Sequence, residues 1–279
     1  MGDENAPARA FDVSGWCHER ERRWATYGAQ AAHDPWPQTH VFLRDDESCS
    51  LWVAARGSGG GSRQATFRNE LEERLEAGWR ACRRAGWHRE PTHALREFEG
   101  AVQQAFLSAT EPSFAHHFGA TWAAALTRGR RCALVSLGAC RGFLVRGGLA
   151  TQLTTDRTLY TASLAAGAPQ LFGKDISLGA LGAMGTENDP KAFRGQLTAF
   201  DWNAGDRLAL VTGLHPDLVT EGVVAKALER EDDAEVLSRR LYEALLADAR
   251  TAFERDRAQS WCSEREVLRG GAVVVARAR

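Results

Sequence analysis

The fold is decided by the stretch Val135-Ser136-Leu137-Gly138-Ala139-Cys140-Arg141. An apolar run ends at its glycine, and a second apolar run, Gly142–Val145, follows directly after the stretch. A glycine-rich hairpin turn is expected at Arg146–Leu149, followed by the tetrapeptide Leu153-Thr154-Thr155-Asp156. Short apolar runs bounded by glycines indicate strands rather than a helix, so this region is predicted to be a set of strands joined by tight turns.

Elements of one kind occur in blocks along the rest of the chain. Apolar spacing of three and four residues predicts helices over 67–82 and 94–106, which are long enough to pack as an antiparallel pair, and a last helix over 234–254. A strand leading into a charged turn is predicted over 11–26. Further strands are predicted over 41–43, 51–54, 119–126, 132–137, 142–145, 197–200, 207–211 and 271–276, and residues 160–195 are expected to be irregular. Blocks of this kind, without βαβ alternation, predict an α+β fold with antiparallel sheets.

The landmarks resemble, in order, those of the metal-dependent protein phosphatase family (type 2C, or PPM). Gly138-Ala139-Cys140-Arg141 stands where that family has G-D-S-R. Residues 51–60 are similar to its strand ending V-A-D-G-M-G-G-H, and 204–214 resemble P-G-D-x-L-L-L-x-S-D-G-L. Residues 119–126 are similar to G-x-T-x-x-x-A-L. The resemblance spans about 28–277 and implies a central antiparallel β-sandwich flanked by antiparallel helix pairs. We expect one such domain over 11–279 after a polar, disordered tail over 1–10.

The same resemblance identifies positions where the family binds its metal ions. Here these positions hold Ala55, Ala139, Thr212 and Arg269, and the glycine beside the first aspartate is Arg56. Two magnesium or manganese ions need several carboxylate oxygens, and the family's chemistry is metal-assisted attack of water on a phosphomonoester. Alanine has no ligand atom and arginine repels a cation. The sequence therefore predicts no metal cofactor and no catalytic residues.

Three arginines are expected near the vacated metal site: Arg56, Arg141 and Arg269. Guanidinium groups bind phosphate and carboxylate well, which suggests a metal-free pocket that binds an anion without hydrolysing it. The alternative is that these arginines fill space or pair with Asp34 or Asp156. For Arg141, which stands at an arginine that the family keeps, the structural role is favoured.

The leading interpretation is a catalytically inactive phosphatase-like protein, a pseudophosphatase, that acts as a binding or regulatory module. The resemblance implies a context of bacterial signalling, with a protein partner such as a kinase or a phosphorylated protein. Two alternatives stay open. One is a divergent metal-dependent Ser/Thr phosphatase that recruits other ligands, such as Asp34, Asp156 or Glu187. The other is a structural subunit of a larger complex.

Composition argues against several other classes of protein. The 35 basic and 36 acidic residues leave a formal charge of −1, which gives no attraction to nucleic acid or to an anionic membrane. The first residues lack the apolar core of a secretory signal, and no stretch approaches the roughly 20 apolar residues that span a bilayer. We therefore expect a cytoplasmic protein whose six cysteines, none in a C-x-x-C pair, are reduced.

Other motifs favour structural interpretations. The run Gly57–Ser62 lacks the lysine of a phosphate-binding loop, so it is predicted to be a turn. Adjacent side chains on a strand point to opposite faces, which argues against a metal site at His116-His117. Cys82, His88 and His93 lack the spacing of a zinc site.

Overall fold

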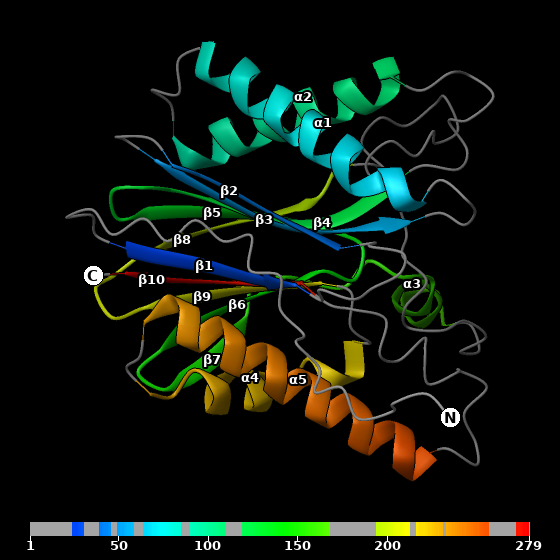
Figure 1. Cartoon of the computed structure of the whole chain (residues 1–279), viewed down its shortest axis with the longest axis vertical. Coiled ribbons are helices and arrows are strands. Elements are labelled where there is room, and N and C mark those ends of the chain that lie inside the picture. Colours follow the sequence, from blue (N-terminus) through cyan, green and yellow to red (C-terminus); the bar gives the residue numbers. More distant parts are fainter. Residues whose placement is uncertain are drawn as a thin grey trace, which may run out of the picture.

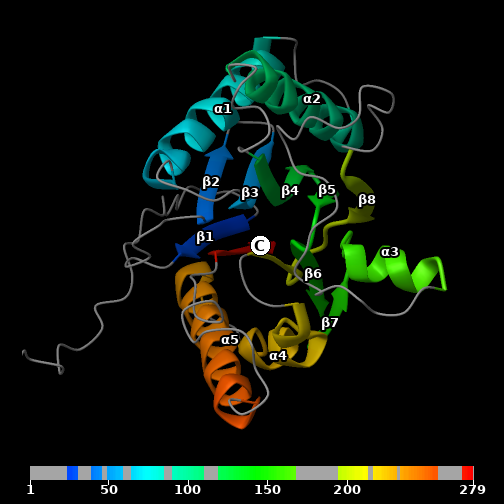
Figure 2. The same cartoon turned by 90° about the vertical axis from the view of Figure 1, so that its right-hand side faces the viewer.

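The computed structural model describes residues 24–30, 39–45, 49–58, 64–84, 90–109, 119–167, 194–212, 216–230, 233–256 and 272–278. Over these residues the chain forms two five-stranded antiparallel sheets that lie face to face, with helices on both outer faces (Figure 1). Figure 2 shows the same layers from the side, with α1 and α2 above the sandwich and α4 and α5 below it. The predicted α+β sandwich is confirmed, whereas the expected tail over 1–10 lies outside the described residues.

The first sheet has the strand order β1-β10-β9-β6-β7. Its strands are β1 (Trp24–Gln30), β10 (Ala272–Ala278), β9 (Arg207–Thr212), β6 (Arg141–Arg146) and β7 (Leu149–Gln152). Two helices, α4 (Glu221–Ala227) and α5 (Ala234–Asp256), cover its outer face, and the 3-10 turn η1 (Pro216–Leu218) precedes them.

The second sheet has the strand order β2-β3-β4-β5-β8. Its strands are β2 (Thr39–Asp45), β3 (Ser50–Ser58), β4 (Gly119–Arg128), β5 (Arg131–Leu137) and β8 (Gln196–Asp201). The predicted helix pair, α1 (Gln64–Arg84) and α2 (Pro91–Ala109), packs on its outer face. None of the described helices is both long and apolar enough to cross a bilayer.

The connection through Gly138 links the two sheets. The sequence predicts a strand on either side of this glycine, and both strands exist, but β5 belongs to the second sheet and β6 to the first. Gly138 has φ 84°, a backbone conformation that favours glycine. The sharp crossover places Cys140, two residues later, in the core between the sheets.

Two short helices were not expected from the sequence. Helix α3 (Leu159–Ala165) lies in the region predicted to be irregular, and α4 lies in a region without a predicted element. Each is only seven residues long, which is too short to show a clear apolar period. Both begin after a threonine N-cap, Thr158 and Thr220, whose side chain accepts a backbone N–H bond.

Strand alternation divides the apolar residues into three layers. In β3, Leu51, Val53 and Ala55 pack toward α1 and α2, whereas Trp52 and Ala54 face the other sheet. A third layer lies between the first sheet and α4 and α5. The central strands are therefore buried on both faces, which explains why they read as continuous apolar runs in the sequence.

Candidate functional site

Polar side chains gather in the otherwise apolar core between the sheets. Each of these side chains is buried or half-buried. Each lies either on the face of a strand that points toward the other sheet or at the crossover between the two sheets. We call this set the inter-sheet polar cluster; its members are Thr39, Arg56, Thr121, Ser136, Cys140 and Thr212. All six come from different segments, so the cluster exists only in the folded chain.

Arg56, and not Ala55, belongs to this cluster. Ala55 is fully buried in the layer that faces α1 and α2, so alternation directs the next side chain between the sheets. Arg56 lies in register between Thr39 of β2 and Thr121 of β4. The sequence placed the family's first aspartate at Ala55, whereas the residue of β3 that faces between the sheets at this point is Arg56. Arg56 is followed by Gly57, as the aspartate of V-A-D-G is followed by a glycine.

Cys140 directly precedes β6, and Thr212 is the last residue of β9, the strand that pairs with β6 in the first sheet. The thiol Sγ lies 2.8 Å from the Thr212 hydroxyl oxygen, and either group can donate the hydrogen bond. Burial raises the pKa of the Cys140 thiol, and this outweighs the hydrogen bonds from Thr212 and Thr121 and the charge of Arg56, which favour the thiolate. The negative charge of Asp156 raises the thiol pKa further. Cys140 is thus a neutral, buried thiol near pH 7, unlike a nucleophilic cysteine.

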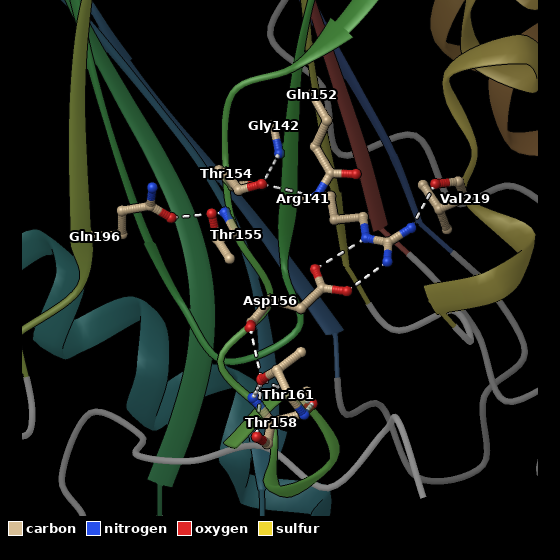
Figure 3. Close-up of polar contacts among 10 residues, drawn as sticks. All are labelled: Arg141, Gly142, Gln152, Thr154, Thr155, Asp156, Thr158, Thr161, Gln196 and Val219. Carbon is tan, nitrogen blue, oxygen red and sulfur yellow. Dashed lines mark hydrogen bonds and ion pairs between the residues drawn. The ribbon is translucent and has the colours of Figure 1, made fainter. Parts of the chain in front are cut away.

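Arg141 points away from the cluster, toward α4. Its Nε donates to Asp156 Oδ1 at 2.9 Å and its Nη2 donates to the second carboxylate oxygen, while Nη1 donates to the Val219 carbonyl at 2.7 Å (Figure 3). Phe143 and Val145, on the same face of β6, pack in the layer against α4 and α5. The pairing of Arg141 with Asp156, one of the two roles considered from the sequence, is therefore the observed one. The structure does not bring Arg141 together with Arg56 on one face.

The segment that carries Asp156 is fixed by further hydrogen bonds. The Thr154 hydroxyl accepts from the Gly142 N–H at 3.1 Å, and the Thr155 N–H donates to Gln196 Oε1 at 2.6 Å. Figure 3 shows this segment running from β7 past β6 to the cap of α3. The L-T-x-D tetrapeptide therefore joins the two sheets and positions the partner of Arg141.

The remaining predicted positions contribute little to a metal site. Ala139 lies half-buried on the crossover, and its methyl group has no ligand atom. Burial raises the pKa of the Cys82 thiol to about 12. His93 is exposed, and its Nε2 lies 3.1 Å from Glu97 Oε1. The described residues contain no group of three or more His, Cys, Asp and Glu side chains that could hold a metal ion. The positions outside the described residues are Arg269, Asp34, Glu187, His88 and His116-His117.

The described cluster does not fit magnesium or manganese. These ions prefer carboxylate, carbonyl and water oxygens, whereas the cluster offers a guanidinium, hydroxyls and a neutral thiol. The one carboxylate that acts on Cys140, Asp156, has both oxygens bound by Arg141. The arrangement presents hydrogen-bond donors and one fixed positive charge.

Solved structures that are similar to this chain include bacterial Ser/Thr phosphatases. The Mycobacterium tuberculosis phosphatase PstP/Ppp matches with a TM-score of 0.66 and 22% identity over 92% of this chain and 98% of that one. The catalytic domain of PstP in complex with two manganese ions matches with a TM-score of 0.61 and 21% identity, over 91% of this chain and 97% of that one. The PPM Ser-Thr phosphatase MsPP from Mycobacterium smegmatis, in complex with cacodylate, matches with a TM-score of 0.60 and 20% identity, over 92% of this chain and 98% of that one.

These likenesses establish a PPM-type phosphatase fold, so the resemblance read from the sequence is confirmed at the level of the fold. No protein-family model matches the sequence, and no curated protein matches it.

The raised thiol pKa gives a direct test of the role of Cys140. We expect iodoacetamide at pH 8 to leave Cys140 unmodified in the folded protein, because the thiol is both buried and protonated. Peptide mass spectrometry after labelling in native buffer and in guanidinium chloride measures this, and the unfolded sample serves as the control. Complete labelling of Cys140 in the folded protein would show a reactive thiol and contradict a structural role.

Proposed function

We propose that this protein is a pseudophosphatase, which uses a phosphatase-like fold to bind a partner in bacterial signalling without hydrolysing phosphate. Its structural neighbours are bacterial Ser/Thr phosphatases, which supports a signalling role. The proposal rests mainly on Arg56, whose side chain faces between the sheets where the family's first metal-binding aspartate is expected.

The charge of Arg56 opposes metal binding by a large margin. Two unit charges about 4 Å apart interact by roughly 4 kcal/mol at an effective dielectric constant of about 20, so a guanidinium and a divalent cation repel by roughly twice that energy. Every 1.4 kcal/mol changes a dissociation constant about tenfold. The loss of one carboxylate and the gain of one cation at the same position therefore outweigh the attraction that a neighbouring hydroxyl could offer.

The same charge favours an anionic ligand. A guanidinium binds phosphate with paired, charge-assisted hydrogen bonds, so a phosphorylated segment of a protein partner is the ligand we propose. Arg269 is the second candidate for this site, while Arg141 is committed to Asp156 and Val219. The neighbour MsPP was solved with cacodylate, an oxyanion, which is consistent with a fold that accepts such ligands. A kinase or a phosphorylated protein is the kind of partner that would supply this segment.

Turnover of p-nitrophenyl phosphate with manganese separates this proposal from a divergent phosphatase. We expect no manganese-dependent hydrolysis above the buffer rate, because the cluster lacks the carboxylates that the metals require. The catalytic domain of PstP, assayed in the same buffer, is the positive control. Turnover that rises with manganese and is lost in EDTA would support the divergent phosphatase and overturn our proposal.

Binding of a phosphoserine peptide in EDTA tests the role of the arginines. We expect Arg56→Ala, alone or with Arg269→Ala, to weaken binding by about tenfold or more, since a hydrogen bond to a charged group contributes roughly 1.5–3 kcal/mol. Arg56→Lys, which keeps the charge and loses the planar fork, should lie in between. Arg130→Ala, at the exposed β4–β5 turn, is the matched control. Equal affinities for wild type and the Arg56 variants would contradict an anion site here.

A further inference from the structure

We propose that β8 is an interface between two copies of this chain, which pair edge to edge and join their second sheets into one continuous sheet. The inference goes beyond the proposed anion site, because β8 contributes no residue to the inter-sheet polar cluster. β8 lies at the edge of the second sheet, and β5 is its one neighbouring strand in the described part of the chain (Figure 2).

Alternate residues of β8 direct their backbone groups away from β5. The Trp202 N–H donates to the Arg130 carbonyl at 2.5 Å, so these two residues form a hydrogen-bonded pair at the end of the antiparallel ladder. Hydrogen-bonded and non-hydrogen-bonded pairs alternate along such a ladder. The N–H and C=O groups of Leu197, Ala199 and Asp201 therefore point outward, toward the open side of the sheet.

Side chains of the same chain close both ends of this outward edge. At one end, Glu99 of α2 accepts a hydrogen bond from the Gly195 N–H at 2.6 Å. At the other end, Arg146 Nη2 donates to the Asp201 carbonyl at 2.8 Å. Between these contacts, the outward backbone groups of Leu197 and Ala199 form no hydrogen bond within the described residues, and Ala199 is exposed. We call the outward groups of these two residues the open window of β8.

The open window is complementary to a second copy of itself. When two antiparallel copies meet at Thr198, Leu197 of one copy lies opposite Ala199 of the other, and the two residues exchange both of their N–H···O bonds. The two-fold axis repeats this pair, so four hydrogen bonds use every group of both windows. At each of the two positions a large side chain lies beside a small one, which lets the strands approach closely.

Two exposed leucines lie at opposite ends of the same edge. Leu149 is 75% exposed and pairs with Arg146 in the β6–β7 hairpin, so it lies at the Asp201 end of β8. Leu164 is 47% exposed in α3, which follows a segment that is hydrogen-bonded to Gln196 at the other end. Antiparallel pairing brings opposite ends together, so the end that carries Leu149 in one copy lies beside the end that carries Leu164 in the other. A second copy therefore matches both the open backbone groups and the exposed leucines.

Sedimentation velocity of the full chain over a range of concentrations measures this association. Ala199→Pro removes one outward N–H and keeps the ladder with β5, and an edge strand tolerates proline where its N–H faces solvent. Ala199→Ser, which keeps the N–H, is the matched control. Leu149→Asp and Leu164→Asp test the two ends. Their control is Val236→Asp, at an exposed position of α5, the helix that packs against β1 and β10. Urea unfolding of each variant confirms that it is folded.

We expect a monomer–dimer equilibrium that Ala199→Pro weakens by about tenfold or more, because each dimer loses two hydrogen bonds. Leu149→Asp and Leu164→Asp should each weaken it by about threefold or more, since a carboxylate replaces apolar contact area. Ala199→Ser and Val236→Asp should dimerise as the wild type does.

Hydrogen exchange locates the interface within the dimer. The Leu197 and Ala199 amides should gain protection as the protein concentration rises, whereas the Thr198 amide, which bonds within the ladder to β5, should be protected throughout. A wild type that stays monomeric at every concentration would contradict the inference and leave this edge to a strand of another protein. A dimer that Ala199→Pro leaves unchanged forms through another surface and would contradict it equally.

Discussion

The inward direction of the Arg56 side chain is the constraint on which the chemistry of this fold depends. β3 is paired on both sides, with β2 and β4, so neither its register nor its alternation can shift without breaking two ladders. Ala55 packs in the layer between the second sheet and the helices α1 and α2, so the side chain of the next residue, Arg56, faces the other sheet. A positive charge is therefore fixed on the face of β3 that points between the two sheets.

The rest of this region is held together by contacts that need no metal. Cys140 and Arg141 are adjacent and face opposite sides of the first sheet. Cys140 bonds to Thr212, at the end of β9, and Arg141 bonds to the carbonyl of Val219, just before α4. Both ends of the connection over 212–219 are thus attached to one dipeptide. Asp156 forms an ion pair with Arg141 on the helix side of the first sheet, whereas Arg56 lies on the inter-sheet side.

Much of the fold could be predicted from the sequence because glycines and apolar runs determine it locally. The positions of the helix pair, of the β2–β3 hairpin and of the strands around Gly138 follow from such patterns. The crossover at Gly138 could not be predicted, since a hairpin and a change of sheet need the same turn residue. The sequence did not show which of Ala55 and Arg56 faces between the sheets, because that depends on how β3 packs against the helices. Thr39, Thr121 and Ser136 were not singled out from the sequence, since a threonine or serine in a strand is ordinary until the fold places several on one face of a sheet.

The most direct test is a crystal structure of the full chain grown with excess manganese and recorded at the manganese absorption edge. We predict no anomalous peak between β3 and β9, with the Arg56 guanidinium or an oxyanion bound to it in that space. One or two strong peaks there, with protein oxygens at about 2.0–2.3 Å, would show a metal site and contradict the proposed pseudophosphatase.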